Sequence, residues 1–488
     1  MKEAISGLEP EVLWRHFFKI SQIPRESGSE EGIRRHILDE ARLRGLRSAV
    51  DGAGNVVVYI PGGLPGNPVI LQSHMDMVCE KEPEAIHDFR KDPIRLVRSD
   101  QWIHAQGTTL GADNGIGVAA MLALMESPPA EHPDLELLFT VDEETGLTGA
   151  GNLDTSLLSG TTLVSLDTEE DDTFIIGCAG GRNTRLSLDV SLEDAPLGRM
   201  CVEVEIAGLA GGHSGLDIRK GRGNAIRLMA RFLKDAGASV PFALASLSGG
   251  SKHNAIPRDA FSRILVERPR LDALKELAER ARETFLGELS GPDLGLRVEL
   301  REEITAAEQC TVAPADTARI LDLLHALPHG VTAVDESLGG LVVASTNLAT
   351  CGIDGARFEI LTSQRSSRPS SLDDTSETIA AIGHMAGARV EKVHDYPVWR
   401  PDVNSRVLSV CRQVYEELFG TPPRVQVIHA GLECAVFARK MPGLDMISLG
   451  PAIEQAHSPS ERVLIPTVEK MWRLLTTLLA RLPGDRPA

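Results

Sequence analysis

The sequence lacks the features that mark membrane, exported and nucleic-acid-binding proteins. Its longest unbroken apolar stretch, residues 117–125, falls far short of the about 20 residues needed to span a bilayer. Lys and Arg number 50 against 69 Asp and Glu, a net charge of −19 with no basic cluster, so nucleic acid and anionic membranes are poor partners. The N-terminus shows no charged segment followed by an apolar one, so we expect no export signal.

Cysteine is scarce, and its spacing excludes two common roles. The seven cysteines are scattered from Cys79 to Cys434 with no CxxC pair, so the sequence offers no thiolate zinc site. An odd number also argues against a disulfide framework and indicates reduced thiols in the cytoplasm. No repeat with a period of about 20–50 residues appears. The 488-residue length predicts about three domain-sized units.

Strands and helices alternate at both ends of the chain. Helices are predicted over 115–125, 405–419 and 468–482. Short apolar runs predict strands at 55–60, 69–72, 135–141, 162–166 and 445–449, and a further strand is expected at 424–428. This order is typical of an α/β fold in which helices sandwich a mixed, mostly parallel sheet.

The middle of the chain has a different pattern. The order strand, strand, helix occurs within 242–285 and again within 341–385. We therefore expect a large inserted α+β domain over residues 183–390, built from two related halves. Residues 1–182 and 391–488 then form the two parts of one interrupted domain.

Charged residues cluster at the predicted strand ends of the first domain, where ligands of open α/β sheets collect. Taken singly, each segment is more typical of a surface pair, a solvated turn or, at Asp113, a helix N-cap. The segments are Ser73-His74-Met75-Asp76, Gly111-Ala112-Asp113-Asn114-Gly115, Asp142-Glu143-Glu144-Thr145-Gly146 and Asp167-Thr168-Glu169.

Together these segments predict a metal centre. Several carboxylates at one sheet edge repel one another unless cations hold them, and mixed His and carboxylate ligands suit divalent zinc, cobalt or manganese. A carboxylate between two ligand pairs can bridge two metals about 3.5–4 Å apart, and we expect Asp113 to be that bridge. A second imidazole would balance His74, and His457 supplies it after the strand 445–449.

The motifs resemble those of the M20 metallopeptidases, most closely the aminoacyl-histidine dipeptidase branch, also called Xaa-His dipeptidases or peptidase D. The resemblance extends from about Leu13 to Leu482, and its long block Gly107–Gly117 is specific to that branch. The matching segments are Ser73-His74-Met75-Asp76-Met77-Val78, Gly107–Gly117, Asp142-Glu143-Glu144-Thr145-Gly146 and Ala456-His457-Ser458-Pro459.

The resemblance implies two divalent metal ions per subunit, zinc first, with cobalt or manganese as alternatives. The implied ligands are His74 and Asp167 on one metal, Glu144 and His457 on the other, and Asp113 shared by both.

Two neighbours of the implied ligands gain catalytic roles. Asp76 is expected to accept the ring N–H of His74 and fix its tautomer, with a solvent-facing turn residue as the alternative. Glu143 precedes Glu144 and is expected to take a proton from the metal-bridging water and return it to the leaving amine.

The resemblance also implies that the inserted domain is a lid. His213, between glycines, resembles the lid histidine that donates to the developing oxyanion; a plain loop residue is the alternative. Asn254 and Arg365 match positions that hold the substrate carboxylate, a task that suits the planar fork of arginine. Arg368 lies nearby, so the choice between the two arginines stays open. Glu433 is assigned either to the substrate's amino end or to a helix start, where the macrodipole favours a carboxylate.

The implied function is hydrolysis of unblocked dipeptides by hydroxide shared between two metals, with Xaa-His substrates such as β-Ala-His preferred. An N-acyl amino acid deacylase, a tripeptide aminopeptidase and a glutamate-releasing carboxypeptidase are alternatives within the same chemistry. A non-catalytic binding protein would lack a ligand or the base, and an oligomerisation scaffold would depend on the middle domain alone. The expected partner is a small peptide. A homodimer stays open, as does whether His213 serves its own subunit or a neighbour's.

Overall fold

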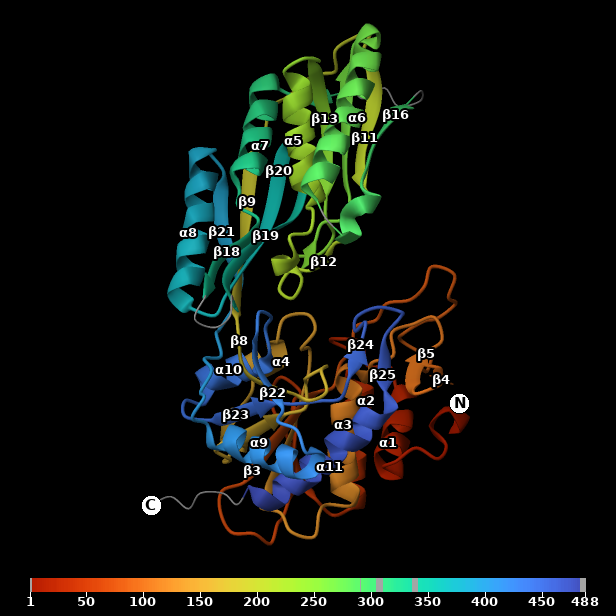
Figure 1. Ribbon diagram of the computed structural model, residues 1–488, viewed down its shortest axis with the longest axis vertical. Coiled ribbons are helices and arrows are strands. Elements are labelled where there is room, and N and C mark those ends of the chain that lie inside the picture. Colours follow the sequence, from red (N-terminus) through yellow and green to blue (C-terminus); the bar gives the residue numbers. More distant parts are fainter. Residues whose placement is uncertain (1, 290, 304–309, 336–340, 483–488) are drawn as a thin grey trace. The chain divides into compact units, whose positions relative to one another are not determined.

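The chain folds into two units, each with its own hydrophobic core (Figure 1). The computed structural model describes residues 2–289, 291–303, 310–335 and 341–482. The second unit, Ala179–Val398 with His429–Gly431, is inserted in the chain of the first. The predicted bounds of the insertion, 183–390, fall a few residues inside this range. The first unit lies within Met1–Cys178, Trp399–Ile428 and Leu432–Ala488.

A mixed sheet forms the centre of the first unit, as the sequence predicted. Its order is β1-β2-β6-β3-β7-β23-β8-β22. The pairs β6–β3, β3–β7, β7–β23 and β8–β22 are parallel, whereas β1–β2, β2–β6 and β23–β8 are antiparallel. The strands are β1 (Arg47–Val50), β2 (Val56–Ile60), β3 (Val69–His74), β6 (Leu135–Thr140), β7 (Thr162–Ser165), β8 (Thr173–Cys178), β22 (Arg424–Ile428) and β23 (Asp445–Ser448).

Helix α3 (Ala112–Glu126) is the central helix of this unit and packs against β3 and α1. Residues 114–125 are all buried, because this segment is apolar on every side and has no solvent-facing stripe. Its first turn lies at the carboxyl end of β3, where His74 contacts Asp113. The other helices are α1 (Glu11–Ser21), α2 (Glu31–Leu43), α4 (Thr148–Gly151), α9 (Arg406–Phe419), α10 (Glu433–Lys440) and α11 (Ile465–Arg481).

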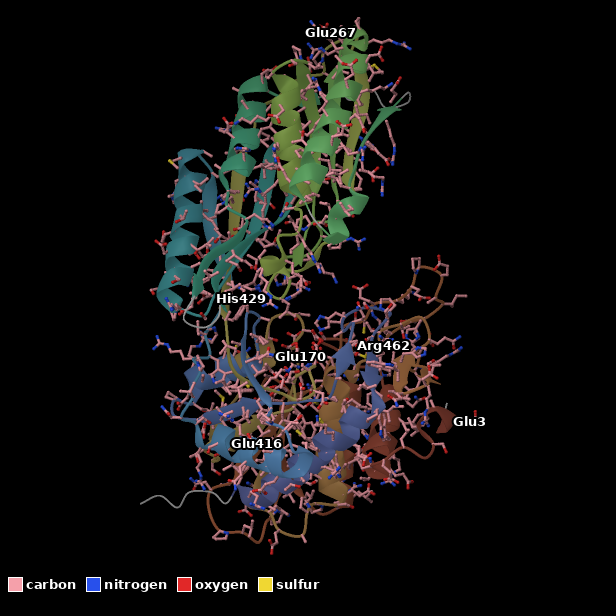
Figure 2. All side chains as sticks on the ribbon, viewed as in Figure 1. Glu3, Glu170, Glu267, Glu416, His429 and Arg462 are labelled. Carbon is pink, nitrogen blue, oxygen red and sulfur yellow. The ribbon has the colours of Figure 1, made fainter. Side chains whose placement is uncertain are left out.

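A small antiparallel sheet joins the C-terminal segment to the N-terminal part of the first unit. Its order is β24 (Ile453–Glu454), β25 (Arg462–Leu464), β5 (Trp102–Ala105) and β4 (Leu96–Ser99). The guanidinium of Arg462, labelled in Figure 2, lies 4.3 Å from the ring centroid of Trp102, a cation–π contact across the β25–β5 pair. This pairing anchors the loop between β24 and β25, which carries His457.

The second unit is an antiparallel sheet covered by four long helices. The main path of the sheet is β16-β11-β15-β13-β19-β20-β9-β21. Helices α8, α7, α5 and α6 lie side by side along it in that order (Figure 1). The helices are α5 (Ala225–Gly237), α6 (Leu271–Glu288), α7 (Pro314–Ala326) and α8 (Pro369–Met385). The strands of the main path are β9 (Gly180–Asp189), β11 (Met200–Ala207), β13 (Phe242–Gly249), β15 (Ala260–Val266), β16 (Arg297–Glu303), β19 (Leu341–Asp354), β20 (Arg357–Ser366) and β21 (Arg389–Tyr396).

The order of elements in the second unit repeats once along the chain. Helix α5, strands β13 and β15, helix α6 and strand β16 are followed by α7, β19, β20, α8 and β21. A common origin of the two halves stays a prediction. The shorter strands are β10 (Leu192–Asp194), β12 (Gly212–His213), β14 (Ala255–Ile256), β17 (Cys310–Val312) and β18 (Gly330–Asp335).

Two negative findings apply to the part of the chain that the structure describes. No helix there combines the length and apolar character that a membrane span requires. None of the seven cysteines, all of which are described, forms a disulfide.

Candidate metal centre

The first half of the candidate centre lies at the carboxyl end of β3. His74 is the last residue of this strand and is 1 % exposed; its Nε2 lies 3.2 Å from Asp113 Oδ1 and 3.3 Å from Asp167 Oδ1. Asp113 comes from the start of α3, and Asp167 follows β7, the neighbour of β3. The sheet order therefore brings together one imidazole and two carboxylates that are far apart in the sequence.

The second half of the centre consists of His457 and Glu144. His457 Nε2 lies 3.1 Å from Asp113 Oδ2 and 3.1 Å from Glu144 Oε2. Asp113 thus directs one oxygen toward each imidazole. Burial alone would lower the pKa of His457, but its hydrogen bonds to Asp113 and Glu144 raise it to about 12. The imidazoles lie in a concentration of negative charge that a cation would offset.

The donor set fits divalent cations. Single ligand atoms of His74, Asp113 and Glu144 all lie within 4.8 Å of one another. Glu144 Oε1 is buried with no hydrogen-bond partner among the described residues, and burial followed by the Asp113 carboxylate raises the pKa of Glu144. Coordination to a metal ion would account for a buried carboxylate oxygen that has no hydrogen-bond partner. Imidazole and carboxylate donors suit zinc, cobalt and manganese alike.

Asp76 links the strand-end histidine to the loop of Glu143 and Glu144. Its Oδ1 lies 3.3 Å from His74 Nδ1, and its two oxygens accept the backbone N–H groups of Glu143 and Glu144 at 3.1 Å each. The Ser27 hydroxyl donates to it at 2.7 Å. Burial alone would raise the pKa of Asp76, but the hydrogen bond with His74 lowers it. A charged Asp76 beside Nδ1 favours the ring hydrogen on that nitrogen and leaves Nε2 of His74 as the ligating atom.

Glu143 has the surroundings of a proton acceptor. Burial, and then the neighbouring Glu144 carboxylate, raise the pKa of Glu143 well above its usual range. Its backbone is fixed by Asp76, so the side chain leaves the loop from a defined position.

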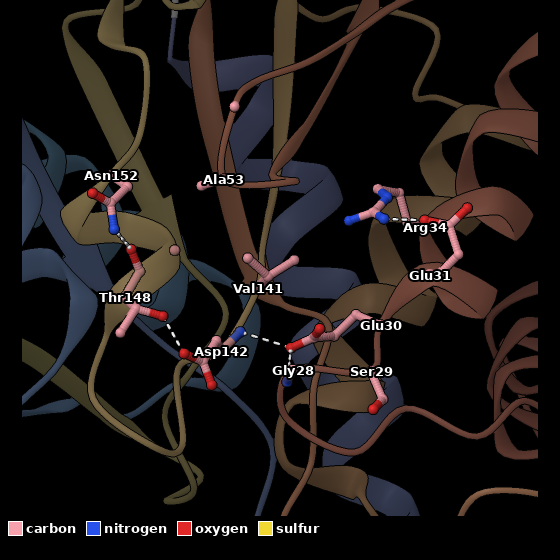
Figure 3. Close-up of a pocket in the computed structure, with 12 residues that line it drawn as sticks. Gly28, Ser29, Glu30, Glu31, Arg34, Ala53, Val141, Asp142, Thr148 and Asn152 are labelled. Carbon is pink, nitrogen blue, oxygen red and sulfur yellow. Dashed lines mark hydrogen bonds and ion pairs between the residues drawn. The ribbon is translucent and has the colours of Figure 1, made fainter.

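The same loop is held from its other side by Glu30. This side chain is 6 % exposed, and its Oε1 accepts the N–H groups of Gly28 at 2.8 Å and Asp142 at 3.0 Å (Figure 3). The Asp142 carboxylate accepts the Thr148 hydroxyl, and Asp142 has a left-handed φ of 52°. The hollow beside these residues has a volume of about 580 Å³, and its lining contains none of the five predicted metal ligands.

Three residues that the sequence did not single out complete the surroundings of the ligands. Asn114 Nδ2 donates to Asp167 Oδ1 at 2.6 Å. Arg25, 3 % exposed, donates to the carbonyls of Asp76 and Gly111. Glu461 accepts backbone N–H groups at the start of α3. The sequence could have pointed to Asn114, which lies inside a recognised motif, and to Glu461, which lies just beyond one. Arg25 lies in no recognised motif.

In the second unit, His213 and Asn254 lie on neighbouring segments. His213 ends β12, which pairs with β14, and the carbonyl of Asn254 accepts the N–H of Ser214 at 2.8 Å. His213 Nδ1 accepts the N–H groups of Gly215 and Leu216 at 3.3 and 3.1 Å. In the neutral ring the hydrogen therefore lies on Nε2, which makes Nε2 the donor.

Arg365 and Arg368 have different surroundings in the second unit. Arg365 on β20 is 7 % exposed, and its Nη1 donates to the Tyr396 hydroxyl at 2.6 Å. Its Nε is buried with no hydrogen-bond partner among the described residues. Arg368 is exposed and pairs with Asp335. The unmet donor favours Arg365 as the carboxylate-binding arginine.

Glu433 begins α10 but does not face solvent. It is 1 % exposed, and its Oε2 accepts bonds from Gln72 Nε2 and Thr140 Oγ1, both at 2.6 Å. Burial raises the pKa of Glu433 to about 8. Its Oε1 has no hydrogen-bond partner within the described part of the chain.

Comparison with known proteins gives matches over the full chain. The cytosol non-specific dipeptidase of Escherichia coli K12 is 37 % identical over 483 residues, which cover 98 % of this chain and 99 % of the relative. The crystal structure of aminoacylhistidine dipeptidase from Vibrio alginolyticus matches with 36 % identity and a TM-score of 0.79, and all of both chains is covered. A tripeptidase from Staphylococcus aureus, at 16 % identity and a TM-score of 0.55, covers 98 % of this chain and 99 % of its own and shows the fold alone.

The model of peptidase family M20/M25/M40 matches residues 70–481, a range that includes all five predicted metal ligands. The resemblance found in the sequence motifs is thereby confirmed. The chain belongs to peptidase family M20/M25/M40 and is a metallopeptidase.

Proposed function

We propose that this enzyme is a cytosolic dipeptidase that hydrolyses short unblocked dipeptides and prefers Xaa-His substrates, β-Ala-His included. The names of the two relatives at 36–37 % identity both support the dipeptidase class. The name of the Escherichia coli relative supports the cytosolic location, but it calls that enzyme non-specific, so the histidine preference is supported by the name of the Vibrio alginolyticus structure alone. The observation that carries the proposal is the placement of Asp113, whose oxygens lie 3.2 Å from Nε2 of His74 and 3.1 Å from Nε2 of His457.

The proposed centre holds two divalent cations, zinc first, with cobalt or manganese as alternatives. When bound, the cations polarise the scissile carbonyl and lower the pKa of the attacking water. The proposed ligands are His74 and Asp167 for one cation, Glu144 and His457 for the other, and Asp113 for both.

Glu143 is the proposed general base and acid. It takes a proton from the attacking water and passes it to the leaving nitrogen. The raised pKa of Glu143, caused by burial and by Glu144, helps the side chain to keep the proton until the amine leaves. Asp76 supports this role because it fixes both His74 and the backbone of Glu143.

The remaining groups are assigned to the substrate. His213 donates Nε2–H to the oxyanion, and the Nδ1 bonds from Gly215 and Leu216 support that tautomer. Asn254 and Arg365 bind the substrate carboxylate, and the unmet Nε of Arg365 supports its part. Glu433 binds the amino end through Oε1, which has no hydrogen-bond partner among the described residues.

Hydrolysis of a small substrate panel tests this proposal. Protein stripped with chelator and reloaded with zinc, cobalt or manganese is assayed on β-Ala-His, Ala-His, Gly-His, Ala-Ala, N-acetyl-Ala and a tripeptide. We expect metal-dependent cleavage of the dipeptides, fastest for the Xaa-His members. Cleavage of N-acetyl-Ala alone would instead indicate a deacylase, and cleavage of the tripeptide alone an aminopeptidase.

A further inference from the structure

A buried carboxylate from the C-terminal segment caps the helix that carries Asp113. Glu461 is 2 % exposed. Its Oε2 accepts the N–H groups of Leu110 at 2.7 Å and Gly111 at 2.8 Å, and its Oε1 accepts those of Ala112 at 2.8 Å and Asp113 at 3.2 Å. The first N–H groups of a helix have no partner within it, and negative charge is favoured there. One side chain thus satisfies four consecutive donors.

Regular helix geometry does not fix the backbone of Asp113. Although it lies within α3, Asp113 has φ −78° and ψ 112°, and Asn114 has φ −103° and ψ 30°. The direction in which the Asp113 carboxylate leaves the chain therefore depends on the groups that hold the adjoining peptide units. Glu461 is such a group, because it binds the N–H of Asp113 and of the three residues before it.

The segment that carries Glu461 also supplies one of the proposed metal ligands. Glu461 lies four residues after His457, in the loop between β24 and β25. This loop contacts Asp113 at two points. The His457 imidazole lies beside the Asp113 carboxylate, and the Glu461 carboxylate accepts the backbone N–H of Asp113. Arg25 extends the link toward His74, because it donates to the carbonyls of Gly111 and Asp76.

We propose that Glu461 is a positioning residue of the metal centre, which holds Asp113 where its two oxygens face His74 and His457. The inference rests on the ligand assignment of the proposed function. In Glu461→Gln, one acceptor oxygen becomes an NH₂ donor that faces backbone N–H groups, so two of the four hydrogen bonds are lost. We expect the start of α3 to shift and metal binding to weaken.

Glu136 provides a matched control for the loss of a buried carboxylate. It is 3 % exposed and accepts the N–H groups of Ser159 and Gly160 at 2.9 and 3.0 Å. Glu136 lies near the start of β6, whereas the loop with Glu144 follows the end of that strand. Glu136→Gln therefore removes comparable hydrogen bonds from the same unit without touching a proposed ligand.

The test compares wild type, Glu461→Gln and Glu136→Gln as full chains stripped of metal. Cobalt and zinc binding is measured by equilibrium dialysis, together with the visible spectrum of bound cobalt and the Tm. We expect both variants to lower the Tm, but only Glu461→Gln to weaken metal binding, by about 10- to 100-fold, and to change the cobalt spectrum. At saturating metal its kcat falls while its KM stays near the wild-type value.

The outcomes separate this inference from the function on which it rests. Wild-type metal affinity and cobalt spectrum in Glu461→Gln would overturn the inference and leave Glu461 as a helix cap only. If Glu461→Gln does not fold, Glu461→Asp takes its place, because it keeps the charge but is one methylene shorter. Its metal affinity and cobalt spectrum are then compared with those of Glu136→Asp. A wild-type chain that binds no cobalt or zinc would overturn the metal assignment itself, and the inference with it.

Discussion

Asp76 lies 3.3 Å from Nδ1 of His74, on the side of the ring opposite the nitrogen that faces Asp113 and Asp167. The same carboxylate accepts the backbone N–H groups of Glu143 and Glu144. Asp76 therefore fixes both the ring of His74, a proposed ligand, and the loop that carries Glu143, the proposed base.

Replacing Asp76 by Asn is expected to weaken metal binding by about 10- to 100-fold, because an amide cannot accept the ring N–H and both backbone N–H groups. Metal content after dialysis at limiting zinc measures the effect. Ser27→Ala removes only one donor to Asp76 and serves as the control. Equal metal content in Asp76→Asn and Ser27→Ala would contradict the role given to Asp76.

The two imidazoles are expected to serve different metals. His74→Ala and His457→Ala should each lose one of the two cations preferentially, whereas Asp113→Ala should lose both, because Asp113 contacts both rings. Elemental analysis of each variant after dialysis gives the metal content per chain. Retention of two metals in Asp113→Ala would exclude Asp113 as the shared ligand.

Arg365 and Arg368 are expected to differ in their effect on substrate binding. Arg365→Lys should raise the KM for dipeptides by about 10- to 100-fold, since a hydrogen bond to a charged group is worth about 1.5–3 kcal/mol. Arg368→Lys should leave the KM near wild type, because Arg368 is exposed and paired with Asp335. The reverse order of KM values would assign the carboxylate to Arg368.

The second unit is expected to lose stability in acid through His329. Burial, and then Arg227, lower the pKa of His329 from 6.5 to about 3, and its Nδ1 contacts the N–H of Leu348 at 3.4 Å. The folded state holds this ring neutral, so its contribution is fully present above pH 6.5. As the pH falls from 6.5 toward 3, the unfolded chain takes up the proton first, and stability is lost by up to about 1.4 kcal/mol per pH unit.

Urea unfolding at pH 7 and pH 5 measures this effect. His329→Gln cannot take up the proton, so its free energy of unfolding should fall less between the two pH values than that of wild type. His325→Gln, at an exposed position on helix α7, is the control for the His-to-Gln substitution itself. Identical pH dependence in all three proteins would show that His329 does not titrate on unfolding.

Much of the fold followed from local pattern. The strand at 424–428 was predicted with the bounds that β22 has. Helix α3 begins three residues before the predicted 115–125, because Glu461 satisfies its first N–H groups from a remote segment. Helices α1 and α2 were not predicted.

Only the site residues that lie in recognisable sequence motifs could be predicted from the sequence. His74, Asp113, Glu144, Asp167 and His457 sit in recognisable segments, and the structure brings them together. The groups that hold them were harder to find, because their contacts span long sequence separations. Arg25 reaches Gly111, and Glu461 reaches Leu110, across distances along the chain that no local pattern encodes.

Glu143 is the proposed base of the two-metal centre, and Glu143→Gln removes its ability to accept a proton from water. Metal content and hydrolysis of β-Ala-His and Ala-His are measured for wild type, Glu143→Gln and Glu416→Gln, a control on the outer helix α9. We predict two metals per chain in all three and a kcat lowered by about 10²- to 10⁴-fold in Glu143→Gln alone. Wild-type turnover by Glu143→Gln with both metals bound would exclude Glu143 as the base.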